Sequence, residues 1–236
     1  MKKLIIPILL FSILVSCTIE IHRTNRQSSN IQPEPPKEAI VAPEPKVADD
    51  FDPCAKEMEV LQKIDAKTGS SKLNNTQDEG ALQHVAYFDS DPEVRMTAVR
   101  LLTDEGSLQH VAYFDNNVGV RKLAVYKLSD EGSLQHVAYF DNNIEIRLLA
   151  VCKITDEGSL QHVAYFDHNV SVRILAVRKI TDEGSLQHVA YFDRNKDVRK
   201  IAISKTTDQG TLEHVARFEN DSELKKIAIE KLGSQQ

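Results

Sequence analysis

Six copies of a 26-residue unit fill residues 77–232, and most copies carry the same polar side chains at the same positions. A glutamine, the histidine after it and a tyrosine four residues beyond the glutamine recur in the first five copies. Aromatic anchors beside adaptable polar groups are typical of binding surfaces. We therefore predict a shared binding surface made of Gln83, His84, Tyr87, Gln109, His110, Tyr113, Gln135, His136, Tyr139, Gln161, His162, Tyr165, Gln187, His188 and Tyr191.

The row of histidines, which ends at His214, also invites a metal-binding interpretation. Each helix offers only one histidine, however, and neighbouring helices pack about 8–10 Å apart. Metal sites built from histidine use ligands three or four residues apart on one helix, or several converging elements. We therefore expect no bound metal and no cofactor. The sequence also shows no Ser-His-Asp or Cys-His arrangement, so we predict no catalytic residues and do not expect an enzyme.

Acids and basic residues form a second ladder, with one acid and one basic residue in each copy. A groove lined by arginines could bind phosphate, but every arginine has an acid nearby, which favours structural ion pairs within and between copies. The residues are Asp89, Asp115, Asp141, Asp167, Asp193 and Glu219, with Arg95, Arg121, Arg147, Arg173, Arg199 and Lys225.

The elements that must position these residues follow from the repeat. The segment Asp-Glu-Gly-Ser-Leu-Gln-His-Val-Ala-Tyr-Phe-Asp stands unchanged at 104–115, 130–141, 156–167 and 182–193, whereas the second half of each copy varies. A shared ligand-facing surface would explain why even the outward-facing residues of the first half are identical between these copies. Tight stacking or patchwise gene conversion would explain it equally.

Each copy predicts two short helices, at about 130–140 and 143–154 in the third copy. Ser129 is the expected N-cap of the first helix, and an Asp or Asn such as Asn143 is that of the second. An alanine in every second helix, Ala150 in this copy, should permit close helix packing. Such a pair cannot bury its apolar face alone, so the copies must stack on one another.

The run Asp89-Ser90-Asp91-Pro92-Glu93-Val94-Arg95, continuing to Ala98-Val99 and Leu102, resembles the short HEAT-like repeats of phycobilin-lyase-type proteins. The 26-residue period is also close to that of the leucine-rich-repeat variant, in which one helix of each pair is a 3₁₀ turn. We expect two α-helices in each pair. The expected fold is all-α, a right-handed α-solenoid of six helix-pair repeats over residues 77–232, followed by a tail at 233–236.

The N-terminal part of the chain predicts where the protein is located in the cell. Residues 1–16 hold two lysines and an apolar run too short to span a bilayer, as in a signal peptide. The ending Leu14-Val15-Ser16-Cys17 resembles the lipobox of bacterial lipoproteins, which implies lipid attachment at Cys17 and anchoring in the cell envelope. Residue 18 is Thr and not Asp, which by analogy with the enteric sorting rule favours the outer membrane, facing the periplasm or the cell surface. Residues 17–50 are rich in proline and lack periodicity, so we expect a disordered tether.

Cys54 and Cys152 are the two remaining cysteines. Cys54 lies in a predicted helix within residues 51–76, which we expect to cap the N-terminal end of the stack. Counterparts of Cys152 in the other copies are Arg, Tyr, Ser or Glu, which predicts an exposed thiol. About three copies separate the two residues, so we expect no disulfide.

The formal net charge is −6 and no basic cluster occurs, which argues against nucleic acid as a partner. We expect a monomeric, membrane-anchored scaffold that binds an envelope protein or another ligand. Two alternatives stay open. One is an enzyme or chromophore-handling protein, by analogy with lyase-type relatives, and the other is a structural spacer.

Overall fold

The structure, a computed structural model, describes residues 53–66, 73 and 78–234. These residues form thirteen α-helices and no strand. The expected signal peptide at 1–16, Cys17 and the tether at 17–50 lie outside the described residues. Within them, the expectation of an all-α repeat architecture is confirmed.

Helix α1 spans Pro53–Asp65 and stands apart from the repeats. The first helices of the six repeats are α2 (Glu79–Phe88), α4 (Glu105–Phe114), α6 (Glu131–Phe140), α8 (Glu157–Phe166), α10 (Glu183–Phe192) and α12 (Gln209–Phe218). The second helices are α3 (Pro92–Leu101), α5 (Val118–Lys127), α7 (Ile144–Lys153), α9 (Val170–Lys179), α11 (Lys196–Lys205) and α13 (Ser222–Ser234). Both members of each pair are α-helical, and α13 continues past the expected end at Leu232.

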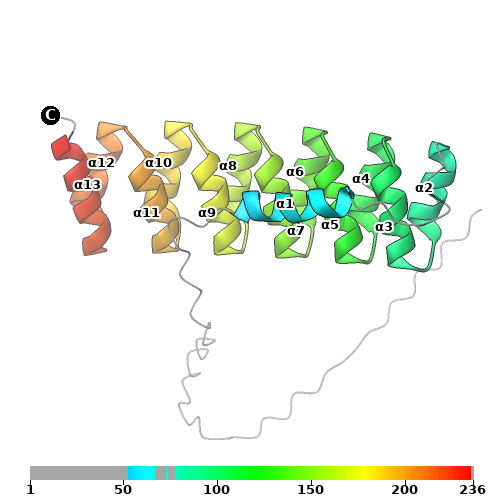
Figure 1. The fold of residues 1–236 in the computed structure, drawn as a ribbon. Coiled ribbons are helices and arrows are strands. Elements are labelled where there is room, and N and C mark those ends of the chain that lie inside the picture. The colour runs from blue at the N-terminus through cyan, green and yellow to red at the C-terminus, as the bar shows by residue number, and fades with distance from the viewer. Residues whose placement is uncertain (1–52, 67–72, 74–77, 235–236) are drawn as a thin grey trace, which may run out of the picture. The chain divides into compact units, whose positions relative to one another are not determined.

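The helix pairs stack side by side in one row (Figure 1), with second helices in closer contact with one another than first helices are. Leucine, valine and isoleucine fill the space between the two layers, and the recurring alanine is fully buried at each second helix, as at Ala98, Ala150 and Ala202. The predicted close packing at these alanines agrees with that burial.

The N-caps of the second helices are the predicted Asp and Asn residues; the Asn143 side chain, for example, accepts from the backbone N–H of Glu145 and Ile146. The expected serine or threonine caps of the first helices are wrong. The cap is the aspartate one residue later, because the Asp130 carboxylate reaches both the N–H and the hydroxyl of Ser133, at 2.7 and 2.6 Å. Ser129 instead offers its N–H to Glu105 of the preceding repeat.

Charged side chains join each repeat to the next at three places. A glutamate such as Glu131 accepts from the backbone N–H groups of Thr155 and Asp156 in the following repeat, at 2.7 and 2.8 Å. An arginine such as Arg147 donates two hydrogen bonds to the carboxylate of Asp167, at 2.8 and 3.1 Å. The predicted acid–arginine ladder is therefore structural, with the ion pairs running between repeats.

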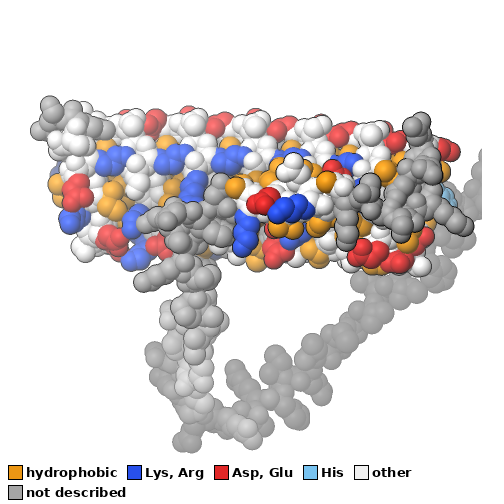
Figure 2. Space-filling view, in the orientation of Figure 1, with side chains coloured by type: hydrophobic (Ala, Val, Ile, Leu, Met, Phe, Trp, Pro, Cys, Tyr) orange, Lys and Arg blue, Asp and Glu red, His pale blue; other side chains and the backbone are white. Residues whose placement is uncertain are grey.

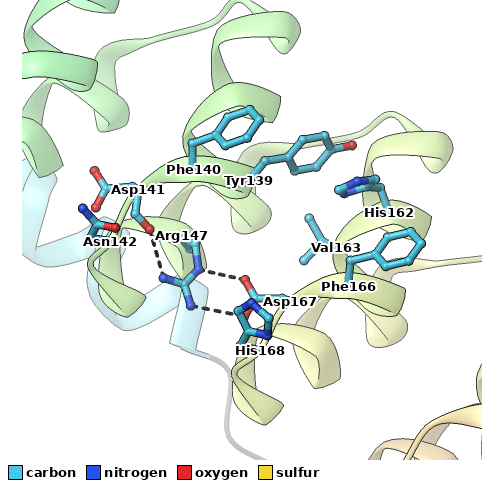
Figure 3. A pocket seen from close by; sticks show the side chains of 11 residues that line it. Tyr139, Phe140, Asp141, Asn142, Arg147, His162, Val163, Phe166, Asp167 and His168 are labelled. Atoms are coloured by element: carbon cyan, nitrogen blue, oxygen red, sulfur yellow. Dashed lines mark hydrogen bonds and ion pairs between the residues drawn. The ribbon is translucent and has the colours of Figure 1, made fainter. Parts of the chain in front are cut away.

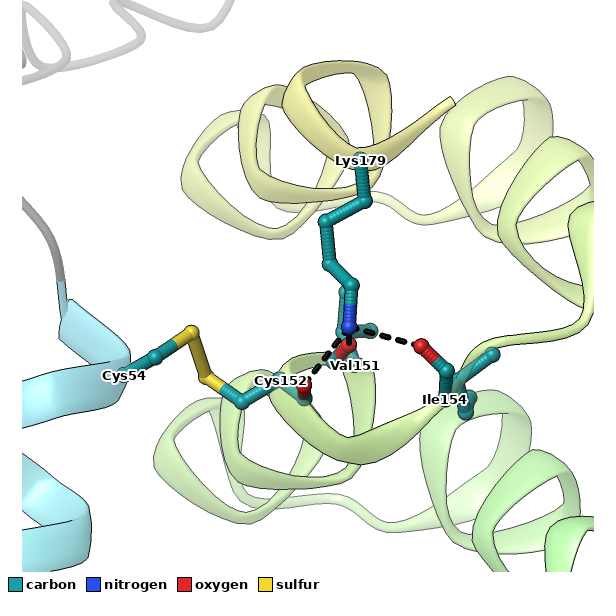
Figure 4. Close-up of a disulfide and its surroundings, with 5 residues drawn as sticks. All are labelled: Cys54, Val151, Cys152, Ile154 and Lys179. Carbon is teal, nitrogen blue, oxygen red and sulfur yellow. Dashed lines mark hydrogen bonds between the residues drawn. A yellow bond between two sulfur atoms is a disulfide. The ribbon is translucent and has the colours of Figure 1, made fainter. Parts of the chain in front are cut away.

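The third contact is a lysine that sequence reasoning missed. Lys179 points back to the end of α7 and donates to the carbonyl oxygens of Val151, Cys152 and Ile154, at 2.8, 2.6 and 2.6 Å (Figure 4). These carbonyls have no partner within their own helix end. Burial lowers the pKa of Lys179 and of its counterparts Lys153 and Lys205, because the charged amine has lost part of its hydration.

Helix α1 does not cap the end of the stack as expected. It lies across α5 and α7, on the face formed by the second helices (Figure 1), and it buries Leu61 there. Glu57 pairs with Lys122 of α5 at 2.9 Å, and the same lysine pairs with Glu145 of α7 at 2.6 Å. Hydrophobic, basic and acidic side chains are mixed on this face around α1 (Figure 2).

The expectation of two free cysteines is also wrong. Cys54 of α1 and Cys152 of α7 form a disulfide, with their Cα atoms 5.5 Å apart (Figure 4). Cys152 is half-buried under α1. The predicted exposed thiol at Cys152 is therefore wrong, because the comparison of the repeats carried no information about the helix that covers this position. The separation of about three repeats did not apply, because α1 lies beside the third repeat.

Candidate functional site

The predicted binding surface lies on the first helices, and the structure divides its three residue types into two groups. Glutamine and tyrosine are mostly half-buried and serve the stacking. The Gln109 amide donates to the Tyr113 hydroxyl at 3.2 Å and to the hydroxyl of Ser133 in the next repeat at 3.0 Å. The tyrosine ring contacts the histidine of the following repeat, and the glutamine amide holds the tyrosine hydroxyl within the same helix.

The six repeat histidines are exposed, as predicted. Each one from the second repeat onward stacks on the tyrosine of the repeat before it; for His136 and Tyr113 the ring centroids are 4.0 Å apart. His136 also lies 4.9 Å from the ring of Phe140 in its own helix. Because Phe140 in turn contacts Tyr139 at 6.1 Å, the rings form one continuous chain from the first repeat to the sixth.

The most exposed members of this chain are phenylalanines, which the predicted binding surface did not include. Each is the last residue of its first helix. Their exposed fractions are 71% at Phe88, 70% at Phe114, 66% at Phe140, 64% at Phe166, 69% at Phe192 and 57% at Phe218. These six residues, with His84, His110, His136, His162, His188 and His214, are called the phenylalanine–histidine row below.

A shallow pocket lies between successive phenylalanines of the row. Between the third and fourth repeats it has a volume of about 240 Å³, and Phe140 and Phe166 belong to its lining (Figure 3). Tyr139 extends across it toward His162, while the Arg147–Asp167 ion pair lies at its base. That ion pair is nearly buried, with side-chain exposures of 13% and 7%, so its charges are already neutralised within the protein.

The terminal repeats provide an internal control for what these residues do. No repeat precedes the first one, and residues that elsewhere reach back to the preceding repeat are replaced there: Ala81 stands in place of serine and Leu101 in place of lysine. The last repeat lacks neighbours after it, and residues that reach forward are replaced there. The last-repeat replacements are Gln209 for glutamate, Glu213 for glutamine, Arg217 for tyrosine and Lys225 for arginine.

The phenylalanine and the histidine do not follow this rule. Both are retained in all six repeats, including His84, which has no preceding tyrosine to stack on, and Phe218, which no following repeat contacts. Stacking thus explains the identity of the glutamine, tyrosine and serine between copies, but it does not explain the exposed row. An exposed aromatic residue that the stacking does not require is the kind of residue that marks an interaction site.

In the described part of the chain, no group of three or more histidine, cysteine, aspartate or glutamate side chains is placed to hold a metal ion. Among the described helices, none has the length and apolar character needed to cross a bilayer.

Comparison with known proteins adds no assignment. The chain matches no protein-family model, and searches of curated proteins and of solved structures returned no match.

Proposed function

We propose that this protein is a binding scaffold that holds a partner protein on its phenylalanine–histidine row. The observation that carries the proposal is the retention of exposed phenylalanine and histidine in all six repeats, while residues that serve stacking change in the terminal ones. Aromatic side chains supply much of the binding energy at protein interfaces. Six of them on one rigid row form an extended contact surface of the kind that helical-repeat proteins use.

We also propose that the scaffold is a right-handed, HEAT-like solenoid tethered to the bacterial cell envelope by lipid at Cys17. The Leu14-Val15-Ser16-Cys17 ending supports lipid attachment. The Cys54–Cys152 disulfide supports an oxidising compartment outside the cytosol, since disulfides rarely persist in cytosolic proteins. Incorporation of radiolabelled fatty acid into the wild type but not into Cys17→Ser, with release of the variant from the membrane fraction, is the expected result. Fatty-acid label on the Cys17→Ser variant, or no label on the wild type, would contradict the proposed lipid attachment.

The binding function is tested by site-specific photo-crosslinking in the full chain. A benzophenone side chain is placed at Phe140 and, as a control, at Ile229, which is 55% exposed but lies on α13 away from the row. We expect a discrete crosslinked protein from the first site and none from the second.

The crosslinked protein is then produced, and its affinity is measured with two variants. Phe114→Ala/Phe140→Ala/Phe166→Ala should lose at least about tenfold, equivalent to 1.4 kcal/mol. Ile144→Ala/Ile229→Ala, which removes exposed apolar side chains from second helices, should keep the wild-type affinity. Equal crosslinking at both sites, or equal affinity of both variants, would refute the proposal and favour a spacer role.

A further inference from the structure

The first helices expose the same four residue types in every repeat. In the third repeat these are the capping Asp130, then Gly132, His136 and Phe140, and the other residues of the helix are buried or half-buried. Glycine, histidine and phenylalanine follow one another at intervals of four residues, which places them on one stripe of the helix. All six repeats, including the first and the last, have these four types at these positions. The exposed face of the first helices therefore has one composition along its whole length.

The capping aspartates of this face are charged and have no basic partner. Asp130 accepts both the N–H and the hydroxyl of Ser133 through a single carboxylate oxygen, Oδ2. These hydrogen bonds lower the pKa of Asp130, so its carboxylate stays ionised. Among the described side chains, no ion pair includes a capping aspartate, whereas Asp141, at the other end of the same helix, is 7% exposed and paired with Arg121. The negative charge on this face is therefore available to a partner.

Charge is divided unevenly between the two helix layers. Each of the first five first-helix segments, cap included, holds two acids and no lysine or arginine. The second acid, such as Glu131, is half-buried and is partly compensated by its electrostatic interaction with Lys179. The second helices carry the basic residues; α9, for example, has three of them and no acid. A contact between the first-helix faces of two copies of this chain would therefore bring like charges together, which disfavours a second copy as the partner.

The imbalance is largest in the first four repeats. Between residues 78 and 181, every lysine and arginine is buried or half-buried. Exposed cations appear beside the row only in the last two repeats, where Arg194 and Arg217 accompany Glu213. A cationic partner therefore fits best over the first four repeats. The exposed acids of residues 78–181 are Asp78, Asp91, Glu93, Asp104, Asp130, Glu145 and Asp156.

The sixth repeat shows how a cation lies on a phenylalanine of the row. Arg217 stands where the other five repeats have tyrosine, and its guanidinium lies 5.1 Å from the centroid of the Phe218 ring. A cation within about 6 Å of an aromatic ring centroid is attracted by the ring quadrupole. The other five phenylalanines of the row are more exposed than Phe218, and no described lysine or arginine lies over them. A cationic side chain of a partner can take the same position there.

We propose that the phenylalanine–histidine row of the first four repeats binds a basic polypeptide segment, in which arginine or lysine is interspersed with apolar residues. This rests on the proposed function and specifies its partner. The cap and the phenylalanine lie at opposite ends of a ten-residue helix, about 15 Å apart, so the partner covers this width. Its apolar side chains pack on the phenylalanines, and its cationic groups lie over the rings or face the capping aspartates. Glycine between these two sites has no side chain, which lets the partner lie close to the helix.

The test uses fluorescent synthetic peptides and the full chain in detergent, with binding followed by fluorescence polarisation. A peptide of alternating arginine and leucine is compared with peptides in which citrulline, a neutral analogue of arginine, or glutamate replaces every arginine. We expect the arginine peptide to bind best and the citrulline peptide to bind at least about tenfold more weakly, equivalent to 1.4 kcal/mol. Added salt should weaken the arginine peptide, because it screens exposed charges.

Two variants with the same change in net charge separate the proposed site from a general attraction between opposite charges. Asp104→Asn/Asp130→Asn/Asp156→Asn neutralises three capping aspartates and keeps an acceptor at each cap. Glu145→Gln/Glu223→Gln/Glu230→Gln neutralises three exposed acids of the second helices. We expect the first variant to bind the arginine peptide at least about threefold more weakly, since exposed ion pairs are individually weak, and the second to keep the wild-type affinity. Urea unfolding checks that both variants are folded, and the citrulline comparison needs neither of them.

Equal binding of the arginine and citrulline peptides, or equal affinity of the two acid variants, would overturn the proposal. Tighter binding of the glutamate peptide would overturn it in favour of an acidic partner and would leave the proposed binding function standing. If no peptide binds while the photo-crosslinked partner still depends on the phenylalanines, only the inference of a basic segment fails. If that dependence is also absent, both fail.

Discussion

Removing the disulfide should destabilise this protein strongly, although it joins a helix outside the repeats to a single half-buried position of the solenoid. Cys54 and Cys152 are 98 residues apart in the chain, and the loop they close contains the first two repeats and nearly all of the third. In the chain-entropy model, a closed loop of this length stabilises the folded state by about 4.7 kcal/mol at 25 °C, because the unfolded chain is constrained. We therefore expect Cys54→Ser, Cys152→Ser and the double variant to lose the same free energy of unfolding, up to that amount.

Urea unfolding followed by circular dichroism measures the loss, and dithiothreitol should bring the wild type to the level of the variants. Ser204 provides a matched control, because it occupies the position of Cys152 in the fifth repeat and is exposed. Ser204→Ala should change the free energy of unfolding by less than about 0.5 kcal/mol. A loss below about 1 kcal/mol in the cysteine variants would refute the loop-closure reasoning.

Hydrogen exchange gives a second, independent criterion. The disulfide constrains only openings that release the chain between α1 and α7. Amide protection should fall in the first three repeats of the variants and stay unchanged in α12 and α13. Uniform loss of protection along the solenoid would show that the repeats unfold as one unit and that the effect is not local to the closed loop.

Three further predictions follow from the contacts between repeats. Ala150→Leu, at a fully buried contact, should overpack the core and cost about 1–3 kcal/mol in urea unfolding, whereas a neutral result would show that the second helices have room to move apart. Lys179→Met should lower the free energy of unfolding by about 1–3 kcal/mol, because the carbonyls at the end of α7 lose their donor. Amide hydrogen exchange should become faster at the junction of the third and fourth repeats, and Lys226→Met, at an exposed position, is the control. Hydrogen bonds from the side chain and backbone of Ser107 and of its counterparts lower the pKa of the capping carboxylates Asp104, Asp130, Asp156 and Asp182 below the unfolded value of about 3.9. The stabilisation that these carboxylates give the folded state is therefore complete above that pH and is lost as the pH falls through the lower folded-state pKa. Asp130→Asn, which keeps an acceptor at the cap, should flatten the dependence of the free energy of unfolding on pH in this acid range, and an unchanged dependence would contradict the prediction.

The repeat architecture could be predicted from the sequence because the pattern is local and is written six times. The helix bounds are right to within one residue in the third repeat, and the cap at Asn143 is right because an Asp or Asn recurs at this position in all six copies. The caps of the first helices were misplaced because Ser129 and Asp130 are both good caps, and only the reach of the Asp130 carboxylate to Ser133 decides between them.

What could not be predicted depends on contacts between distant segments. A helical wheel describes one helix and gives no indication that α1 returns to cover α5 and α7, so the pairing of Cys54 with Cys152 was out of its reach. The same limit applies to the binding surface. Tyr113 lies on an outward face of its own helix, and the next repeat then partly covers it, whereas Phe114, which the predicted surface did not include, is exposed. Its recurrence in all six copies was the signal that could have identified it.

The position of α1 has a mechanical consequence. A pulling force applied to the chain N-terminal to α1 reaches Cys54 first and passes through the covalent bond to Cys152, in the third repeat. The first and second repeats lie within the closed loop and bear no load, so they are not peeled away one after another. With the N-terminal segment held and a partner pulling on the later repeats, the load path would run through α7 to α13 alone, and the first two repeats would keep their part of the phenylalanine–histidine row intact under tension.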